Sequence, residues 1–127
     1  MNQPVIHGMV NLDTHILIYF LQGTLTKREL KLIGDLTLCI SGVVLWEIFK
    51  LKQIGRIEFE WNQEILLFIR SLVILPMDAS VFLSLPELDF RSDPIDEIIA
   101  ATSIAHSVPL LTRDKKILKS KVVPLAI

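Results

Sequence analysis

Four short apolar runs alternate with segments of helical periodicity, and this alternation most limits what the chain can fold into. The predicted strands are residues 5–12, 36–41, 72–76 and 108–112. Short continuous apolar runs are typical of strands that are buried on both faces. Residues 122–127 form a possible edge strand, because Pro124 would break a central ladder. The pattern predicts an α/β fold with a parallel sheet that carries helices on both faces.

Helical segments fill the gaps between the strands, and several have clear start and stop signals. The predicted helices are residues 14–22, 26–35, 43–55, 62–71, 78–86, 93–107 and 113–120. Thr26 is expected to cap the second helix, and Gly23 and Gly34 to end the first two. The sixth helix has the strongest signals, with Asp93 at the cap and Pro94 at the first helical position.

Length and composition predict a single domain, residues 1–127, with a real hydrophobic core, since 51% of the residues are hydrophobic. No apolar run reaches the roughly 18 residues of a membrane span. The N-terminus has neither a basic start nor a cleavable apolar segment, so we expect no secretion signal. The single cysteine, Cys39, excludes an internal disulfide and fits a reducing cytoplasm, which is the expected location.

The charged residues are unevenly distributed, although the net charge is only −1. That net charge alone argues against a strong nucleic-acid binder. Residues 58–97 are mostly acidic among their charges, whereas residues 113–121 hold five basic residues and one acid. The basic segment either holds phosphates or is an ordinary solvated face, and charge alone leaves both readings open.

Four carboxylates stand at or just past the end of an apolar run, or early in the helix that follows: Asp13, Glu47, Asp96 and Asp114. The carboxyl ends of parallel strands line one crevice, so residues far apart in sequence can converge there. Carboxylates held together repel one another and retain protons unless a cation neutralises them. Mg²⁺ or Mn²⁺, which prefer oxygen ligands, are the natural partners of such a cluster.

Two of these acids have a simple structural alternative. Asp13 is a candidate helix cap, although Thr14 could cap instead and leave Asp13 free to bind a metal. Asp114 could cap the helix that it begins, or form a salt bridge with Arg113 or Lys115. Position alone does not separate these roles from a functional one.

Glu47 is the least expected of the four, because it shares a helical stripe with Val44, Ile48, Leu51 and Ile54. An unpaired charge on a core-facing stripe costs several kcal/mol, on the order of the penalty for a buried ion. A salt bridge, a place at the edge of the stripe, or a bound metal would each explain it.

The remaining polar candidates lie beside the acids. Asp96 could reach back to the cap amide of its helix, but it shares a face with Ala100 and Ser103, whose small side chains let another element approach closely. Ser41 and Thr112 each end an apolar strand, so each could cap the next helix or hydrogen-bond a metal-bound water or a phosphate.

Together these segments resemble a PIN domain, and within that family the VapC-like ribonuclease toxins. The resemblance rests on "LDTHILIYFL", "ISGVVLWEIFKLKQIGRI" and "DPIDEIIAATSIAHSVPLLTRDKKIL". The residues that fall in the family's order are Asp13, Ser41, Trp46, Glu47, Gly55, Arg56, Asp93, Asp96, Thr112 and Asp114. Each motif alone is weak, and their order in a chain of this length makes the resemblance specific.

The resemblance implies a three-layer α/β/α domain with a central parallel sheet of four to five strands. It implies a Mg²⁺- or Mn²⁺-dependent endoribonuclease that is the toxin of a toxin–antitoxin pair, with a small antitoxin as partner, a homodimer as assembly and no membrane partner. The implied catalytic and metal-binding residues are Asp13, Glu47, Asp96 and Asp114. The implied supporting residues are Ser41, Asp93 and Thr112, and the implied RNA contacts are Arg113, Lys115 and Lys116.

Two rivals remain open at this point. The first is a phosphotransfer or phosphatase domain with Asp13 as nucleophile, although "DTH" lacks the second acid expected two residues later. The second is an inactive PIN-like interaction module, which the presence of all four acids disfavours. For the antitoxin, we expect an exposed apolar groove near residues 16–33 and 43–54.

Overall fold

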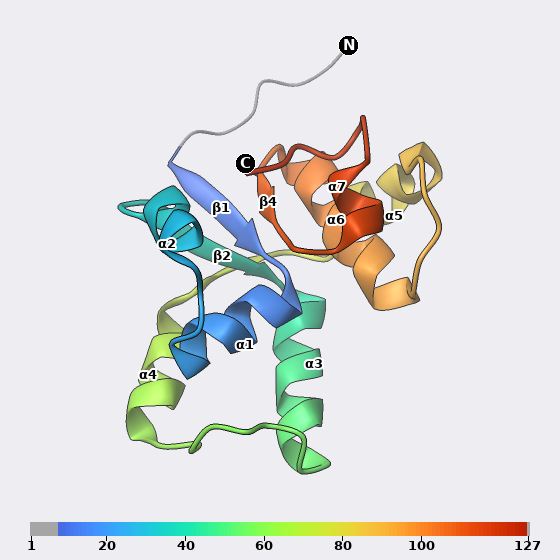
Figure 1. Cartoon of the computed structure of the whole chain (residues 1–127). Helices are drawn as coiled ribbons and strands as arrows, with labels where there is room; N and C mark the ends of the chain where they lie inside the picture. Colours follow the sequence, from blue (N-terminus) through green and yellow to red (C-terminus); the bar gives the residue numbers. More distant parts are fainter. Residues whose placement is uncertain (1–7, 127) are drawn as a thin grey trace.

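The strands form one parallel sheet at the centre of the computed structural model, which describes residues 8–126. Its strands are β1 (Met9–Leu12), β2 (Thr37–Ser41), β3 (Val73–Leu75) and β4 (Leu110–Leu111). Their order across the sheet is β3-β2-β1-β4, and every neighbouring pair is parallel. Helices flank the sheet, so the expected three-layer α/β/α fold of the PIN type is confirmed (Figure 1).

The helices begin and end close to the predicted positions. They are α1 (Thr14–Gln22), α2 (Lys27–Ile33), α3 (Gly42–Gln53), α4 (Gln63–Ser71), α5 (Ala79–Ser84), α6 (Pro94–His106) and α7 (Lys115–Leu118). Gly23 ends α1 in the left-handed region, with φ of 74°, which glycine adopts without strain. Thr26 caps α2 in a capping box with Glu29, whose carboxylate accepts the Thr26 N–H at 2.8 Å.

The two ends of the chain differ from the predicted strands. The part of the first predicted strand before Gly8 lies outside the described residues. The last predicted strand is reduced to a bridge between Leu125 and Leu110, and Ile127 also lies outside the description. Leu110 N–H donates to Pro124 O at 2.8 Å, and Ala126 N–H donates to Leu110 O at 2.9 Å. A proline can accept in such a pair but cannot extend the ladder as a donor.

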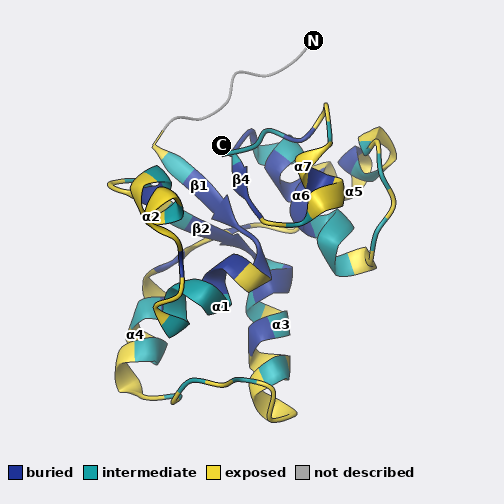
Figure 2. Ribbon diagram, in the orientation of Figure 1, coloured by how far each residue is buried: buried dark blue, intermediate teal, exposed yellow. Residues whose placement is uncertain are grey.

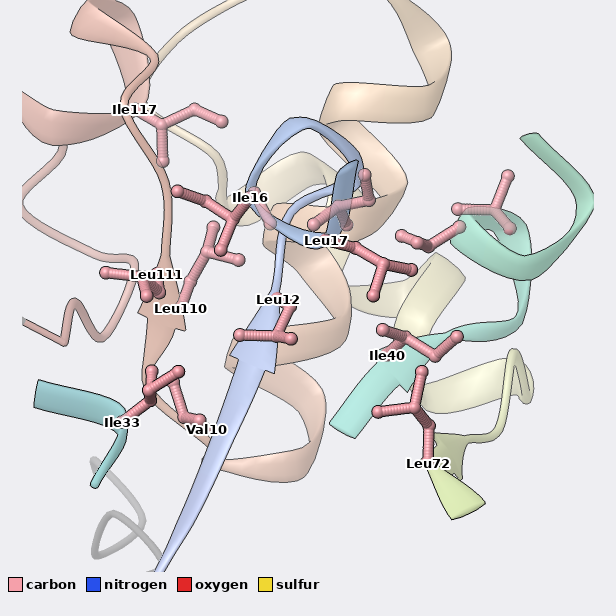
Figure 3. Close-up of a cluster of buried hydrophobic side chains, with 14 of the residues drawn as sticks. Val10, Leu12, Ile16, Leu17, Ile33, Ile40, Leu72, Leu110, Leu111 and Ile117 are labelled. Atoms are coloured by element: carbon pink, nitrogen blue, oxygen red, sulfur yellow. The ribbon is translucent and has the colours of Figure 1, made fainter. Parts of the chain in front are cut away.

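Side-chain alternation along β1 assigns helices to the two faces of the sheet. Val10 and Leu12 point into a cluster with Ile16 and Leu17 of α1, while Ile33 of α2 lies beside Val10 (Figure 3). These five side chains are buried, and they contribute to the largest hydrophobic core among the described residues.

The opposite face of β1 meets α6. The Asn11 amide donates to Ser103 Oγ at 2.9 Å and to Ile99 O at 3.3 Å, and all three residues are buried. Ala100 is also fully buried, so the small-residue face of α6 admits the sheet closely, as expected. Cys39 lies level with Asn11 in the neighbouring strand, and burial raises the pKa of its thiol.

Burial is concentrated where the strands pass into helices (Figure 2). The first turns of α1 and α3 are mostly buried, apart from the exposed His15, whereas residues 52–56 at the far end of α3 and just beyond it are exposed. The helix α3 packs against both α1 and α6, so it links the two faces of the sheet at this end. Within residues 8–126, no helix is both long and apolar enough to cross a membrane.

Candidate metal centre

The carboxyl ends of β1 and β4 bring Asp13 and Thr112 together. The Asp13 side chain is buried, with 4% of the residue exposed, and its Oδ2 accepts a hydrogen bond from Thr112 Oγ1 at 2.6 Å. The same hydroxyl oxygen accepts the Asp114 N–H at 3.0 Å. Thr112 therefore joins the acid that follows β1 to the acid that follows β4, although the two strands lie at opposite ends of the sequence.

Asp13 is also the N-cap of α1. Its Oδ1 accepts the His15 N–H at 3.4 Å, which is a long and weak hydrogen bond. The alternative in which Thr14 replaces Asp13 as the cap is wrong. Thr14 is 1% exposed, and its Oγ1 has no hydrogen-bond partner among the described residues. The Asp13 carboxylate is thus oriented by two bonds, of which the one from Thr112 is the shorter.

Asp114 caps α7, as one of its predicted roles required. Its Oδ1 accepts the N–H groups of Lys116 at 2.9 Å and Ile117 at 3.1 Å. With its own N–H on Thr112, the residue is fixed in three places. Capping and a role at the site are compatible here, because both cap bonds fall on one carboxylate oxygen.

Asp96 lies in the first turn of α6, and the charges of the other acids affect the pKa of its carboxyl. Burial raises the pKa of its carboxyl, a hydrogen bond from Ser92 Oγ at 3.1 Å opposes that rise, and repulsion from Asp13, Asp114 and Asp93 adds to it. The carboxylates of Asp13, just after β1, and of Asp114, in the turn after β4, are therefore near enough to repel the Asp96 carboxylate on α6. Asp13 and Asp114 are joined through Thr112, Asp96 lies near them, and the binding of a metal by these acids stays a prediction.

Asp93 occupies the N-cap position of α6, but its side chain makes no capping hydrogen bond. The expected capping bond is displaced by one residue, because Glu97 Oε2 accepts the N–H of Ser92 at 2.9 Å. Asp93 is exposed, and its charge raises the pKa of Asp96. Its supporting role at the site stays a prediction.

Glu47 lies on α3 and is less closely connected to the other acids than Asp13, Asp96 and Asp114 are to one another. Val44 and Ile48 are fully buried, while Ile54 is 52% exposed, so the predicted apolar stripe ends early. Glu47 itself is half-buried, at the edge of that stripe. It is not among the principal charges that raise the pKa of Asp96. The structure therefore places Glu47 on the helix beside the cluster without joining it to the other acids.

Ser41 is the counterpart of Thr112 at the end of β2. Its Oγ accepts the Val43 N–H at 3.3 Å, which caps α3, and the hydroxyl of Thr102 on α6 donates to it at 3.4 Å. Ser41 is fully buried, but both bonds are at the long end of the range. It links α3 to α6 without touching a carboxylate through either bond.

The donor set fits a hard divalent cation. Carboxylate oxygens are the ligands that Mg²⁺ and Mn²⁺ prefer, and the repulsion on Asp96 is of the kind that a cation relieves. Between residues 8 and 126, no three His, Cys, Asp or Glu side chains stand close enough to form a ready-made ion site. Mg²⁺ keeps several of its waters, so carboxylates at this spacing can hold it partly through water.

Of the three predicted phosphate contacts, two lysines are exposed, whereas Arg113 is paired with a carboxylate. Lys115 and Lys116 are exposed, and Lys116 Nζ lies 3.4 Å from the carbonyl of Arg91. Arg113 is turned toward α1 and α2, where its Nε and Nη2 each donate to the Glu29 carboxylate at 2.7 Å. Its guanidinium also lies 4.2 Å from the ring centre of Tyr19.

Three residues near the site were missed in the sequence: Ser92, Glu29 and Tyr19. Ser92 stands directly before Asp93 and Pro94, so its place before a helix was a usable signal. Glu29 was visible only as the third residue after a Thr cap. Nothing local connects it with a partner 84 residues away.

A groove of about 620 Å³ runs along α3 on a different face from Glu47. Its lining residues are Gly42, Leu45, Trp46, Phe49, Lys50, Lys52 and Gln53. Trp46 is 59% exposed and Phe49 43%, which is unusual for such large apolar side chains. The groove lies within the predicted stretch 43–54 except for Gly42, whereas residues 16–33 do not line it.

Comparisons with known proteins identify the family. Residues 10–122 match the PIN domain family. The ribonuclease VapC22 of Mycobacterium tuberculosis is 29% identical over 85 residues, which are 63% of this chain and 65% of that protein, just under two thirds of its length.

Solved structures show the same fold. VapBC2 from Rickettsia felis, bound to a DNA fragment from its promoter, matches with a TM-score of 0.71 and 24% identity over 92% of this chain and 96% of that one. DNA-bound VapBC from Salmonella typhimurium matches with a TM-score of 0.68 and 17% identity over the same shares of the two chains. With the family match spanning most of the sequence, the chain belongs to the PIN domain family.

Proposed function

We propose that this protein is a divalent-metal-dependent endoribonuclease and the toxin of a toxin–antitoxin pair. The observation that carries the proposal is the link from Asp13 through Thr112 to Asp114 in a PIN domain, with Asp96 near enough for both charges to raise its pKa. The similarity to a protein named as a ribonuclease supports the choice of RNA as substrate.

Asp13, Glu47, Asp96 and Asp114 would hold one or two Mg²⁺ or Mn²⁺ ions. A bound ion of this kind activates a water and neutralises charge on a phosphodiester as it breaks. Ser41 and Thr112 would support the ligands, Thr112 by its bond to Asp13 and Ser41 by ordering the start of α3. Asp93 would add negative charge at the rim.

The protein's own groups prepare the site before RNA arrives. The Thr112 hydroxyl donates to Asp13 Oδ2 and so holds that carboxylate in a fixed orientation for a cation. Lys115 and Lys116, exposed next to Asp114, would hold the RNA backbone through its phosphates. Arg113 reaches RNA only if it leaves Glu29.

The partner would be a small antitoxin protein with an amphipathic segment. The groove on α3 offers Trp46 and Phe49 for apolar contacts, with Lys50 and Lys52 at its lining for acidic side chains. The solved structures of similar fold include toxin–antitoxin complexes, which supports a partner of this kind.

We also propose self-association as a homodimer in the cytoplasm. Large apolar side chains are exposed along residues 73–83: Val73, Ile74, Met77, Phe82 and Leu83. A monomer rarely leaves this many in one short stretch uncovered. Sedimentation analysis of the purified chain tests the assembly, and a monomer at every concentration would contradict it.

The test of the nuclease is cleavage of single-stranded RNA by the purified chain. We expect cleavage with Mg²⁺ or Mn²⁺, none in EDTA, and a loss of several orders of magnitude in Asp96→Asn. The matched control is Asp35→Asn, an exposed aspartate after α2, which should cleave like the wild type. Full cleavage in EDTA or by Asp96→Asn would contradict the proposal.

Two further observations test the phosphotransfer rival and the toxin role. Stable trapping of an aluminium or beryllium fluoride complex at Asp13 would favour phosphotransfer over nuclease chemistry. For the toxin role, the chain should be toxic when expressed alone and harmless when expressed with a small protein encoded directly upstream. A harmless chain with all four acids intact would contradict the toxin role while leaving the nuclease standing.

A further inference from the structure

We propose that Glu29, Arg113 and Tyr19 form a clamp that positions the turn Thr112–Asp114, and that Arg113 is a positioning residue and not an RNA contact. The inference rests on the proposed nuclease, because it assigns a task to residues that lie just outside the acidic site. It replaces the role that the sequence predicted for Arg113.

The clamp joins three elements that are far apart in sequence. Arg113 stands between β4 and α7, and its fork donates two parallel hydrogen bonds of 2.7 Å to the Glu29 carboxylate of α2. The guanidinium lies 4.2 Å from the centre of the Tyr19 ring on α1. A bidentate pair that also stacks on an aromatic face fixes direction as well as distance.

Glu29 is itself anchored, so the clamp has a firm base. It occupies the third position of α2 and completes the capping box with Thr26. Its side chain is only 12% exposed, while that of Arg113 is 41% exposed. Ion pairs on open surfaces contribute little, but this one combines a preset acceptor, good geometry and partial burial.

The two neighbours of Arg113 are the residues that organise the acids. Thr112 donates to Asp13 and receives the N–H of Asp114. Holding Arg113 toward α1 and α2 therefore fixes the backbone between these two contacts. If the turn were free to rotate, the Thr112 hydroxyl would lose its alignment toward Asp13, and the Asp114 N–H would lose its contact with Thr112.

The variant Glu29→Gln separates positioning from RNA binding, because glutamine also supports a capping box while its neutral side chain weakens the clamp. If Glu29 merely keeps Arg113 away from RNA, the variant should bind and cleave RNA better. If the clamp positions the site, the variant should bind Mn²⁺ roughly tenfold more weakly without RNA present, like the loss of an outer-shell partner. Arg113→Lys should behave like Glu29→Gln, because an ammonium cannot make the bidentate contact.

The readout is Mn²⁺ affinity, measured by electron paramagnetic resonance on the whole chain, with circular dichroism to confirm folding. The matched control is Arg70→Gln, an exposed arginine at the end of α4, which should keep wild-type affinity. Wild-type Mn²⁺ affinity in folded Glu29→Gln and Arg113→Lys would overturn the clamp. Absence of Mn²⁺ binding by the wild type would instead overturn the proposed function, so the two failures are distinguishable.

Discussion

The ends of β4 and β2 both pass from a strand into a helix beside the acidic site, yet they are built differently. At the end of β4, Thr112 makes bonds of 2.6 Å and 3.0 Å to Asp13 and Asp114. At the end of β2, Ser41 makes bonds of 3.3 Å and 3.4 Å, and neither reaches an acid. One side of the site is therefore preassembled by short bonds, whereas the side that carries Glu47 depends on the packing of α3.

This difference indicates how a carboxylate cluster can be stable without a metal. The preassembled side spreads the charge of Asp13 and Asp114 over hydroxyl and backbone donors. The half-buried Glu47 lies outside the strongest repulsion. We infer that Glu47 is the least fixed of the four acids in the metal-free protein and would move the most when a cation binds.

The largest expected difference between the two sides is in RNA cleavage. Losing an outer-shell partner of a metal costs up to ~100-fold. Asp13 is proposed to hold the metal directly, so Asp13→Asn should lower the cleavage rate by at least that factor. Glu47→Gln should lower it less, because its side of the site can adjust. Rates for both variants at saturating Mn²⁺ test this, and an equal loss in the two would break the distinction.

The next effect is the response of the melting temperature to metal. With free Mn²⁺ at 100 times the dissociation constant, binding to the folded state alone adds about 2.7 kcal/mol. That should raise the Tm of a chain this size by roughly 10 °C. In EDTA, Asp96→Asn should melt higher than the wild type, because the pKa of Asp96 is raised by burial and like charges. In EDTA, Glu47→Gln should change Tm little.

A lower Tm for Asp96→Asn in EDTA would show that Asp96 is stabilising through its bond with Ser92, and would contradict the account of repulsion. Differential scanning calorimetry in EDTA, with Asp35→Asn as control, gives the comparison directly.

Much of this arrangement could be predicted from the sequence, and the limits have a physical cause. Caps such as Thr26 and terminators such as Gly23 act over a few residues, so the local pattern contains them. Asp13 and Asp114 were found because each follows a strand, and parallel topology brings strand ends together. Glu47 and Asp96 were found because each lies in a helix with a readable sequence pattern.

The contacts that decide the site's geometry were not predictable in the same way. Thr112 meets Asp13 across 99 residues, and Arg113 meets Glu29 across 84. Each of these contacts depends on the order of the strands in the sheet and on side-chain rotamers that packing sets. Neither has a local signature in the sequence. For the same reason the partner of Arg113 was missed, and the resemblance implied only an RNA contact for it, as for Lys115 and Lys116 in the same basic segment.

A smaller effect separates the two hydroxyls that end the strands. Thr112→Val should destabilise the fold by about 2 kcal/mol, because it leaves buried acceptor and donor groups without a partner. Ser41→Ala should cost only about 0.5 kcal/mol, at the low end for a cap, since its bonds are long. Thr112→Ser is the matched control and should recover most of the loss. Chemical denaturation measures all three, and similar costs at the two ends would contradict the contrast.

The last predicted effect concerns acid stability and the clamp, and it is confined to low pH. The hydrogen bonds from Arg113 lower the pKa of the Glu29 carboxyl from 4.5 to about 2. A depressed folded pKa stabilises the protein above pH 4.5, and that stabilisation is lost as pH falls toward 2. Screening by water at the partly exposed pair reduces it to on the order of 1 kcal/mol. Arg113→Gln should therefore flatten the stability curve between these pH values, and an unchanged curve would show that the pair adds nothing.

The most direct test of the central claim is a Mn²⁺ titration of the metal-free wild type, of Asp96→Asn and of the control Asp35→Asn. If carboxylates from β1, α6 and the turn after β4 form one cation site, the wild type and the control bind Mn²⁺ saturably and with equal affinity. Asp96→Asn should then lose most of that affinity while remaining folded. Saturable binding that survives Asp96→Asn unchanged, or no saturable binding by the wild type, would contradict the account.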